Sequence, residues 1–335
     1  MQLNEYFVKG PHLRPAFNIG CLLDIPTGTY KTGKHGESIL NGGLSHFTGL
    51  VGKGNMFKST IAHFTGLQIL SRYSSSSLLI YDTELTATMD RFQRLYNLNN
   101  PFYQEDLSES ARFLLTDKSV ELGNAFFDRL KGVVELRIKH KKSLLKNTPF
   151  IDPQLQTPIP ILPPMIVEID SLSQTNFDVV QEMFNKHEVG SSKLNTEALK
   201  EAAVKSQMVS QLPQLCARGG MYVIVTAHVG EQHQLDPYAP PAKKLSFLKG
   251  KDKIKRVPEN FTMLPNNLWL MCRDEVLRND LTKAPEYPRD KEDNLKDDTD
   301  LMAITMQNLR AKSGPTGIPF KLVVSQRDGV HVGLS

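Results

Sequence analysis

The stretch "GLVGKGNMFKST" (Gly49–Thr60) decides how the rest of this 335-residue sequence is interpreted. It matches the phosphate-binding pattern G-x-x-x-x-G-K-[ST], except that Phe57 stands where the pattern has its second glycine. An apolar run precedes the turn (His46–Gly52) and helical spacing follows it (Ser59–Tyr73). The sequence therefore predicts a strand, a phosphate-binding turn and a helix. The alternative is an ordinary strand–turn–helix with a surface lysine.

Each position of the turn has a physical task if the stretch binds a nucleotide. Backbone N–H groups at the start of the helix can hold phosphate oxygens. Lys58 can neutralise the terminal phosphates, and the Ser59 hydroxyl can ligate Mg²⁺. The predicted nucleotide-binding residues are Gly52, Lys53, Gly54, Asn55, Met56, Phe57, Lys58, Ser59 and Thr60.

The apolar runs beyond this stretch alternate between strand and helix character. Strand-like runs span 77–84, 111–117, 164–171 and 221–228, and helical runs span 87–98, 120–145 and 195–218. Strands buried on both faces and separated by helices predict an α/β fold, with a mostly parallel twisted sheet and helices on both faces. The last three apolar runs, "LWLMCRD", "LMAITMQNLR" and "FKLVVSQRDG", have no helices between them and predict antiparallel C-terminal strands.

We expect an N-terminal segment (1–16) that contacts another subunit, followed by one α/β core (17–335). Insertions are predicted near 145–164, which is rich in proline, near 230–265, which is basic, and near 279–300, which is charged. The net charge of +4 is too mild to establish a nucleic-acid partner by itself. The three cysteines show no metal-ligand spacing, and no apolar run approaches the roughly 20 residues of a membrane helix. The expected location is the cytoplasm.

Polar residues end three of the predicted strands. "MIVEIDS" supplies Asp170 as a Mg²⁺ ligand, and Glu168 is expected on the opposite face of that strand. "LLIYDTE" offers Asp82 and Glu84, of which Glu84 lies at the tip and is the predicted base or positioner for an attacking water. The alternative for Glu84 is to cap the following helix. "VTAH" ends at His228, which either senses the terminal phosphate or is structural.

In these residues the sequence resembles the RecA-type recombinase core, and most closely the phage UvsX-like recombinases, which also carry Phe-Lys-Ser where Phe57, Lys58 and Ser59 stand here. "FNIGCLLDIPTG", "YDTE", "EIDSL" and "TAH" follow in the order of that family. The resemblance implies a RecA-like P-loop ATPase that uses ATP and Mg²⁺. It implies Glu84 as the catalytic glutamate and His228 as the link between the γ-phosphate and a DNA-binding loop.

The resemblance also implies residues that act between subunits. "NLRAKSGPTGIPFKL" (Asn308–Leu322) resembles a strand–turn–strand whose basic residues, here Arg310 and Lys312, reach into the ATP of the next subunit. Arg91 falls where the family packs a side chain on the adenine. The "GPTG" turn is more similar to replicative hexameric helicases of the DnaB type. The alternative is a hairpin turn with surface bases.

Two loops are implied to hold single-stranded DNA, one at Phe184–Asn195 and one within Gly230–Phe261. The second combines basic residues with an aromatic side chain, which suits phosphates and base stacking. The predicted DNA-binding residues are Lys243, Lys244, Phe247, Lys249, Lys251, Lys253, Lys255 and Arg256. The alternative is a solvated charged surface.

The leading hypothesis is an ATP-dependent, single-stranded-DNA-binding recombinase of phage type, active in recombination, repair and replication. As a DNA-dependent ATPase it would self-associate into a helical filament or a ring, and its further partners would be single-strand-binding or mediator proteins. A short segment precedes the core and the chain ends soon after it, so the polymerisation element and the duplex-gathering domain of recombinases are not expected. Two alternatives stay open: a DnaB-like helicase motor, and a non-catalytic ATP-sensing accessory protein.

Overall fold

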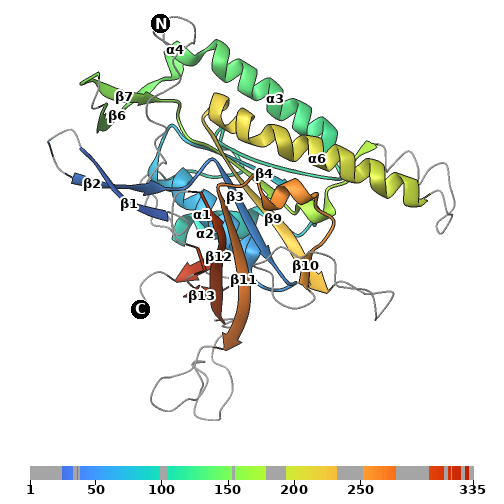
Figure 1. Cartoon of the computed structure of the whole chain (residues 1–335). Coiled ribbons are helices and arrows are strands. Elements are labelled where there is room, and N and C mark those ends of the chain that lie inside the picture. The colour runs from blue at the N-terminus through green and yellow to red at the C-terminus, as the bar shows by residue number, and fades with distance from the viewer. Residues whose placement is uncertain are drawn as a thin grey trace, which may run out of the picture.

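The structure is a computed structural model that describes residues 25–32, 36, 38–98, 104–152, 155–178, 194–231, 252–276, 302–312, 316–317, 319–325 and 329–331. Its core is one 10-stranded sheet with helices on both faces (Figure 1). The predicted N-terminal segment, the first DNA loop up to residue 193 and the insertion at 279–300 lie outside the described residues.

The strands are β1 (Ile25–Thr32), β2 (Ser38–Gly43), β3 (Phe47–Gly52), β4 (Ser77–Asp82), β5 (Phe113–Asp117), β6 (Lys146–Ile151), β7 (Pro158–Ile161), β8 (Met165–Asp170), β9 (Met221–Glu231), β10 (Asp252–Ile254), β11 (Asn267–Val276), β12 (Met302–Ala311), β13 (Pro319–Ser325) and β14 (Gly329–His331). The helices are α1 (Lys58–Arg72), α2 (Met89–Leu98), α3 (Gly123–Lys139), α4 (Lys141–Leu144) and α6 (Leu194–Gly219), with 3₁₀ turns η2 (Leu172–Gln174) and η3 (Glu259–Thr262).

The main sheet has the order β14-β13-β12-β11-β3-β9-β8-β4-β5. Its six strands from β11 to β5 are parallel to their neighbours, and β12, β13 and β14 continue the sheet antiparallel. This arrangement confirms the predicted α/β fold with antiparallel C-terminal strands. The short strand β10 adds to the carboxyl end of β9, antiparallel to it.

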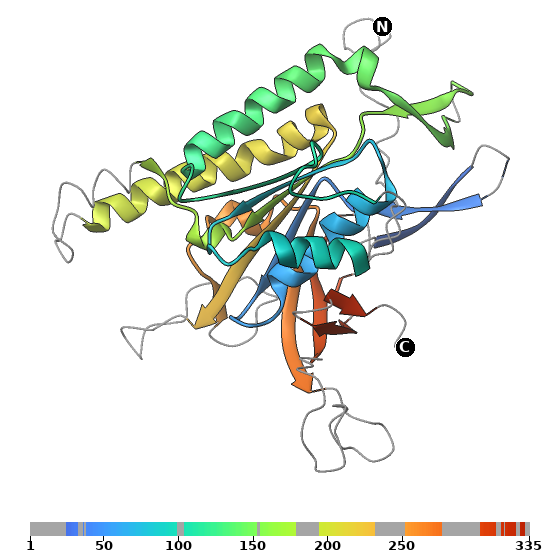
Figure 2. The same ribbon diagram turned by 180° about the vertical axis from the view of Figure 1, so that it is seen from behind.

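Two apolar cores lie on the two faces of the sheet. Helices α1 and α2 cover one face, and α3 and α6 lie side by side over the other (Figure 2). Neighbouring residues of one strand alternate between the cores: Leu50 faces α1, and Val51 faces the α3–α6 side. The central strands are therefore buried on both faces, which explains their continuous apolar runs. Among the described helices, none combines the length and the apolar character that a bilayer span needs.

Two hairpins stand apart from the main sheet on the same side of the molecule (Figure 2). The first, β1–β2, was not predicted. The second, β6–β7, forms from the proline-rich insertion, for which no strands were predicted. In β7 the exposed Pro158 and Pro160 flank the buried Ile159. A two-stranded hairpin tolerates proline because N–H groups that face away from the partner strand have no ladder bond to lose.

Candidate nucleotide-binding site

The carboxyl ends of four neighbouring parallel strands meet at one edge of the sheet. Gly52 of β3 pairs with His228 of β9, and Asp82 of β4 pairs with Asp170 of β8. Since β8 and β9 are also neighbours, these four residues lie along a single edge. Ligands of open α/β sheets bind at this edge. The structure therefore brings together the strand ends that the sequence singled out.

The predicted phosphate turn leads from β3 into α1. Asn55 and Phe57 both have left-handed backbone, with φ of 57° and 55°. Phe57 is the N-cap of α1 and its side chain makes no capping hydrogen bond. The first turn of the helix contains no acidic residue. The N–H groups of a helix start need acceptors, and the positive end of the helix dipole favours an anion. A phosphate group fits this requirement.

Phe57 replaces the glycine of the pattern at some conformational cost. A left-handed backbone disfavours residues with a Cβ by roughly 1–2 kcal/mol. The ring is only 9% exposed and packs in the core on the α1 face, beside Met56. Burial of a ring of this size contributes about 1.5–3 kcal/mol, which offsets the cost of the backbone. The turn is thus anchored by an aromatic side chain at the position where the common pattern has glycine.

We expect Phe57→Gly to destabilise the fold although it restores the common pattern. Loss of a buried phenylalanine costs roughly 3–5 kcal/mol, and relief of the left-handed backbone returns about 1–2 kcal/mol. The net loss of roughly 1–4 kcal/mol is measured by urea unfolding. Met56→Ala, which deletes a neighbouring core side chain without changing the left-handed position, is the matched control. Equal or higher stability of Phe57→Gly would contradict the anchoring role of the ring.

Lys58 is held inside the site. Its side chain is 6% exposed, and Nζ donates a hydrogen bond to the Lys53 carbonyl at 2.7 Å. Burial lowers the pKa of Lys58, while the charges of Asp170 and Glu84 act in the opposite direction. The amine therefore lies within electrostatic reach of both acids. Ser59 follows it in α1 and is half-buried.

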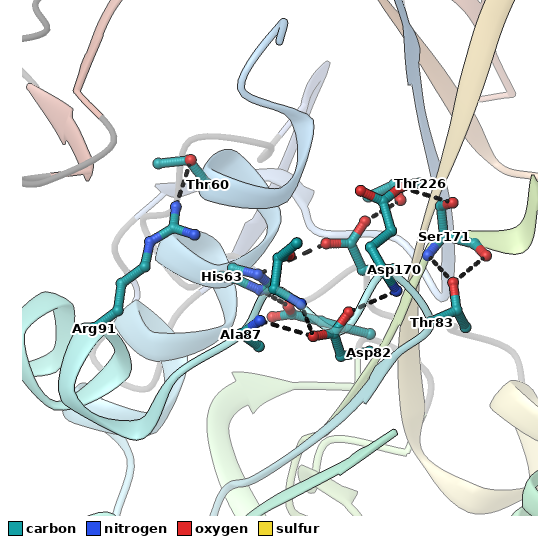
Figure 3. A network of polar contacts seen from close by, with 12 residues as sticks. Thr60, His63, Asp82, Thr83, Ala87, Arg91, Asp170, Ser171 and Thr226 are labelled. Carbon is teal, nitrogen blue, oxygen red and sulfur yellow. Dashed lines mark hydrogen bonds and ion pairs between the residues drawn. The ribbon is translucent and has the colours of Figure 1, made fainter. Parts of the chain in front are cut away.

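Asp170 is almost completely buried at the end of β8. Oδ1 accepts a short hydrogen bond from the Thr226 hydroxyl, and Oδ2 lies 3.7 Å from His63 Nε2 (Figure 3). Within the described residues, no group of three or more His, Cys, Asp and Glu side chains is arranged to hold a metal by itself.

The expectation that Glu168 faces the opposite side from Asp170 is wrong. Residues two apart on a strand share a face, and both carboxylates point toward α1. Glu168 Oε2 lies 2.7 Å from His63 Nδ1, so one imidazole contacts both acids. Burial raises the pKa of Glu168. The sequence offered no signal for this contact, because His63 stands in an apolar helix far from β8 along the chain.

Glu84 lies at the tip of the β4 edge, as predicted, and does not cap α2. Its Oε1 accepts hydrogen bonds from His228 Nε2 at 2.6 Å and from the Ser171 hydroxyl at 3.1 Å. The hydrogen bond from His228 is the main cause that lowers the pKa of Glu84. A carboxylate with a lowered pKa stays ionised at neutral pH, as a base that orients water must.

Asp82 has a structural role beside Glu84. Its carboxylate accepts four backbone hydrogen bonds, all between 2.8 and 3.0 Å, from the N–H groups of residues 84, 85, 86 and 87. Thr83 Oγ1 donates to the Ser171 carbonyl at 2.8 Å and accepts from the Ser171 N–H at 2.7 Å. These bonds fix the backbone that carries Glu84 against the end of β8 (Figure 3).

Arg91 of α2 reaches toward the phosphate-loop helix. Its Nη2 donates to the Thr60 hydroxyl at 2.7 Å, which ties α2 to the first turn of α1 (Figure 3). A groove of about 440 Å³ runs along the same helix, lined by Asp90, Gln93, Arg94, Asn97 and Leu98. Arg91 is thus placed next to the predicted nucleotide-binding residues.

Arg310 and Lys312 are not brought to the phosphate loop of their own chain. Arg310 of β12 pairs with Leu268 of β11, which pairs with Gly49 near the amino end of β3. The Lys312 N–H donates to the Asn266 carbonyl at 2.9 Å, still further from the carboxyl edge. Both basic residues therefore lie toward the amino edge of the sheet.

Of the predicted DNA-binding residues, Lys253, Lys255 and Arg256 are described and exposed. The others, Lys243, Lys244, Phe247, Lys249 and Lys251, lie outside the described residues. The Lys255 N–H donates to the His228 carbonyl at 2.7 Å. The Ser173 hydroxyl accepts from the His228 N–H at 3.0 Å and donates to the Lys255 carbonyl at 2.9 Å. Lys255, which directly follows β10, is thus fastened to the backbone of His228, the residue that contacts Glu84.

No family model matches the sequence, and no curated protein matches it. Among solved structures, the chain is similar to one described as "Crystal structure of the RadB recombinase". The match covers 86% of this chain and 92% of the other, with 15% sequence identity and a TM-score of 0.43. A likeness of this degree carries no functional argument.

Proposed function

We propose that this protein is a DNA-dependent ATPase of recombinase type, which binds ATP with Mg²⁺ at the edge formed by β3, β9, β8 and β4. The observation that carries the proposal is the Glu84–His228 contact of 2.6 Å in front of the phosphate turn. This contact joins the ionised Glu84 to His228 of β9, and the sequence after β9 contains the basic residues predicted to bind DNA. A P-loop fold used only to bind a nucleotide has no need of that connection.

Each residue of the site has a defined task in ATP hydrolysis. Lys58 and the first N–H groups of α1 bind and orient the phosphates of the substrate. Ser59 and Asp170 would hold Mg²⁺, which supplies charge neutralisation when it is bound. Glu84 orients the attacking water and accepts its proton. Arg91 would lie beside the nucleoside.

His228 and β10 couple the nucleotide to single-stranded DNA in this proposal. If His228 exchanged its contact with Glu84 for a contact with the substrate, His228 would move. The hydrogen bonds through Ser173 would then carry this movement to Lys255. Lys253, Lys255 and Arg256, with the preceding basic residues, would bind the phosphates of the strand. Arg310 and Lys312 would complete the site of a neighbouring copy, since they lie away from the phosphate loop of their own chain.

The test is ATP hydrolysis with and without single-stranded DNA. We expect DNA to stimulate hydrolysis, and affinity for DNA to fall steeply with salt because lysines release counterions when they bind phosphates. Slow hydrolysis that DNA does not affect would instead indicate an ATP-sensing accessory protein. Electron microscopy with an ATP analogue and DNA separates open filaments from the closed hexamers of a helicase motor.

Substitution of Lys253 and Lys255 by alanine is expected to weaken DNA binding equally for all sequences. The slope of log affinity against log salt should fall by roughly one for each lysine that contacts a phosphate. Lys142→Ala with Lys146→Ala, two exposed lysines in α4 and at the start of β6, is the matched control with the same charge change. An unchanged salt slope in the variant that lacks Lys253 and Lys255 would show that these two lysines are not part of the DNA interface.

A further inference from the structure

The site described above contains a buried pair that none of the proposed tasks uses. His63 is 2% exposed and Glu168 is fully buried, and they are joined by a hydrogen bond of 2.7 Å. Glu168 Oε1 has no hydrogen-bond partner among the described residues. A buried carboxylate with an unpaired oxygen is costly, and an apolar pair of similar volume would pack at lower cost. Stability alone therefore does not account for these two residues.

The fold makes room for this carboxylate. A Cβ added at Gly66 of α1 would lie 2.2 Å from Glu168 Oε1, closer than any real Cβ contact. The glycine is one helical turn after His63 on the same face of α1. Helix α1 therefore faces β8 with the His63 imidazole and, at Gly66, with a space that the Glu168 carboxylate fills.

The imidazole has a fixed orientation. Its Nδ1 is bonded to Glu168, and its ring packs edge-on against Phe92 at 4.9 Å between centroids, with an interplanar angle of 78°. These two contacts aim Nε2 at Asp170 Oδ2, 3.7 Å away. The other oxygen of Asp170 is bonded to the Thr226 hydroxyl. The Asp170 carboxylate thus lies between Thr226 of β9 and His63 of α1.

We propose that His63 is a positioning residue for the metal carboxylate: Glu168 fixes its ring, and the ring sets the orientation of Asp170 at the phosphate edge. The inference rests on the proposed function, because it assigns Asp170 to Mg²⁺. Residues behind a metal ligand typically change metal affinity by 10- to 100-fold when they are lost. The pair would therefore determine how tightly the site holds Mg²⁺ with ATP.

The decisive variant is His63→Leu combined with Glu168→Met, which replaces the pair by apolar side chains of similar size. We expect it to melt at or above the temperature of the parent protein, because apolar replacement of a buried ionic pair is often neutral or stabilising. The readout is binding of a fluorescent, non-hydrolysable ATP analogue as a function of Mg²⁺ concentration. Half-saturation should require about tenfold more Mg²⁺ or higher. Affinity measured in EDTA should be unchanged.

A second variant keeps the test decisive if the double variant fails to fold. His63→Asn retains an amide at the position of Nδ1, where it can bond Glu168, but has no atom at the position of Nε2. It should fold and show the same increase in the Mg²⁺ requirement. A parent-like Mg²⁺ requirement in either folded variant overturns the inference. Failure of the parent protein to bind the analogue at any Mg²⁺ concentration overturns the proposed function, and the inference with it.

Discussion

Lys58→Met is expected to abolish ATP binding at micromolar protein while leaving the protein at least as stable as the parent. Hydrogen bonds from a charged group to phosphate contribute about 1.5–3 kcal/mol each, so the loss of even one weakens binding roughly 10- to 150-fold. Stability should not suffer, because the buried amine has the Lys53 carbonyl as its hydrogen-bond acceptor and burial already lowers its pKa. Calorimetric titration with ATP and a thermal melt measure the two effects.

Lys53→Met is the matched control for this experiment. It removes the same charge from the same loop, but the Lys53 side chain is exposed, and the predicted role of this position in phosphate binding and its contact with Lys58 both involve the backbone, which the substitution keeps. We expect near-parent affinity from it. Equal loss in both variants would show that net charge, not the position of Lys58, attracts the nucleotide. Unchanged binding by Lys58→Met would remove the phosphate loop from the proposal.

Glu84→Gln should separate turnover from binding. A positioned general base contributes about 10²- to 10⁴-fold to a rate, so hydrolysis should fall by that factor while affinity for ATP stays within a few-fold of the parent. Glutamine keeps the shape of the side chain and still accepts a hydrogen bond from Ser171. Single-turnover hydrolysis and equilibrium binding of ATP are the two measurements.

Asp106→Asn is the control for loss of one negative charge away from the site. Asp106 is solvent-exposed, and its carboxylate bonds only to Ser108 among the described residues, so its loss should leave both measurements unchanged. Normal hydrolysis by Glu84→Gln would show that another group activates the water, and the assignment of Glu84 would be wrong.

The order of strands and helices could be predicted because it depends on local information. The central strands are buried on both faces and read as short apolar runs, and α1 follows a turn with a known pattern. The same locality explains why Asp170 and Glu84 were placed correctly at strand ends. Some strands were not predicted: β1, β2 and β14 form because a partner strand is available, and no sequence periodicity indicates that partner.

The contacts within the site were less predictable than the order of the strands. The pairing of His63 with Glu168 depends on where α1 crosses β8, which no sequence pattern specifies. The face of Glu168 could have been inferred, since a separation of two residues on a strand places it beside Asp170. The left-handed backbone of Phe57 is a third case, because tertiary packing of the ring overrides a preference that favours glycine.

The opposite locations of the phosphate turn and of Arg310 and Lys312 have a consequence for any assembly in which one copy completes the site of the next. Each copy would offer its phosphate turn on one side and these two basic residues on the other, so the contact would be heterologous. A row of such copies therefore has a direction, as a head-to-tail assembly does. Its two ends differ chemically: one has a phosphate turn without a neighbour's basic residues, and the other has Arg310 and Lys312 without a neighbour's phosphate turn. Subunits would therefore be gained and lost at different rates at the two ends.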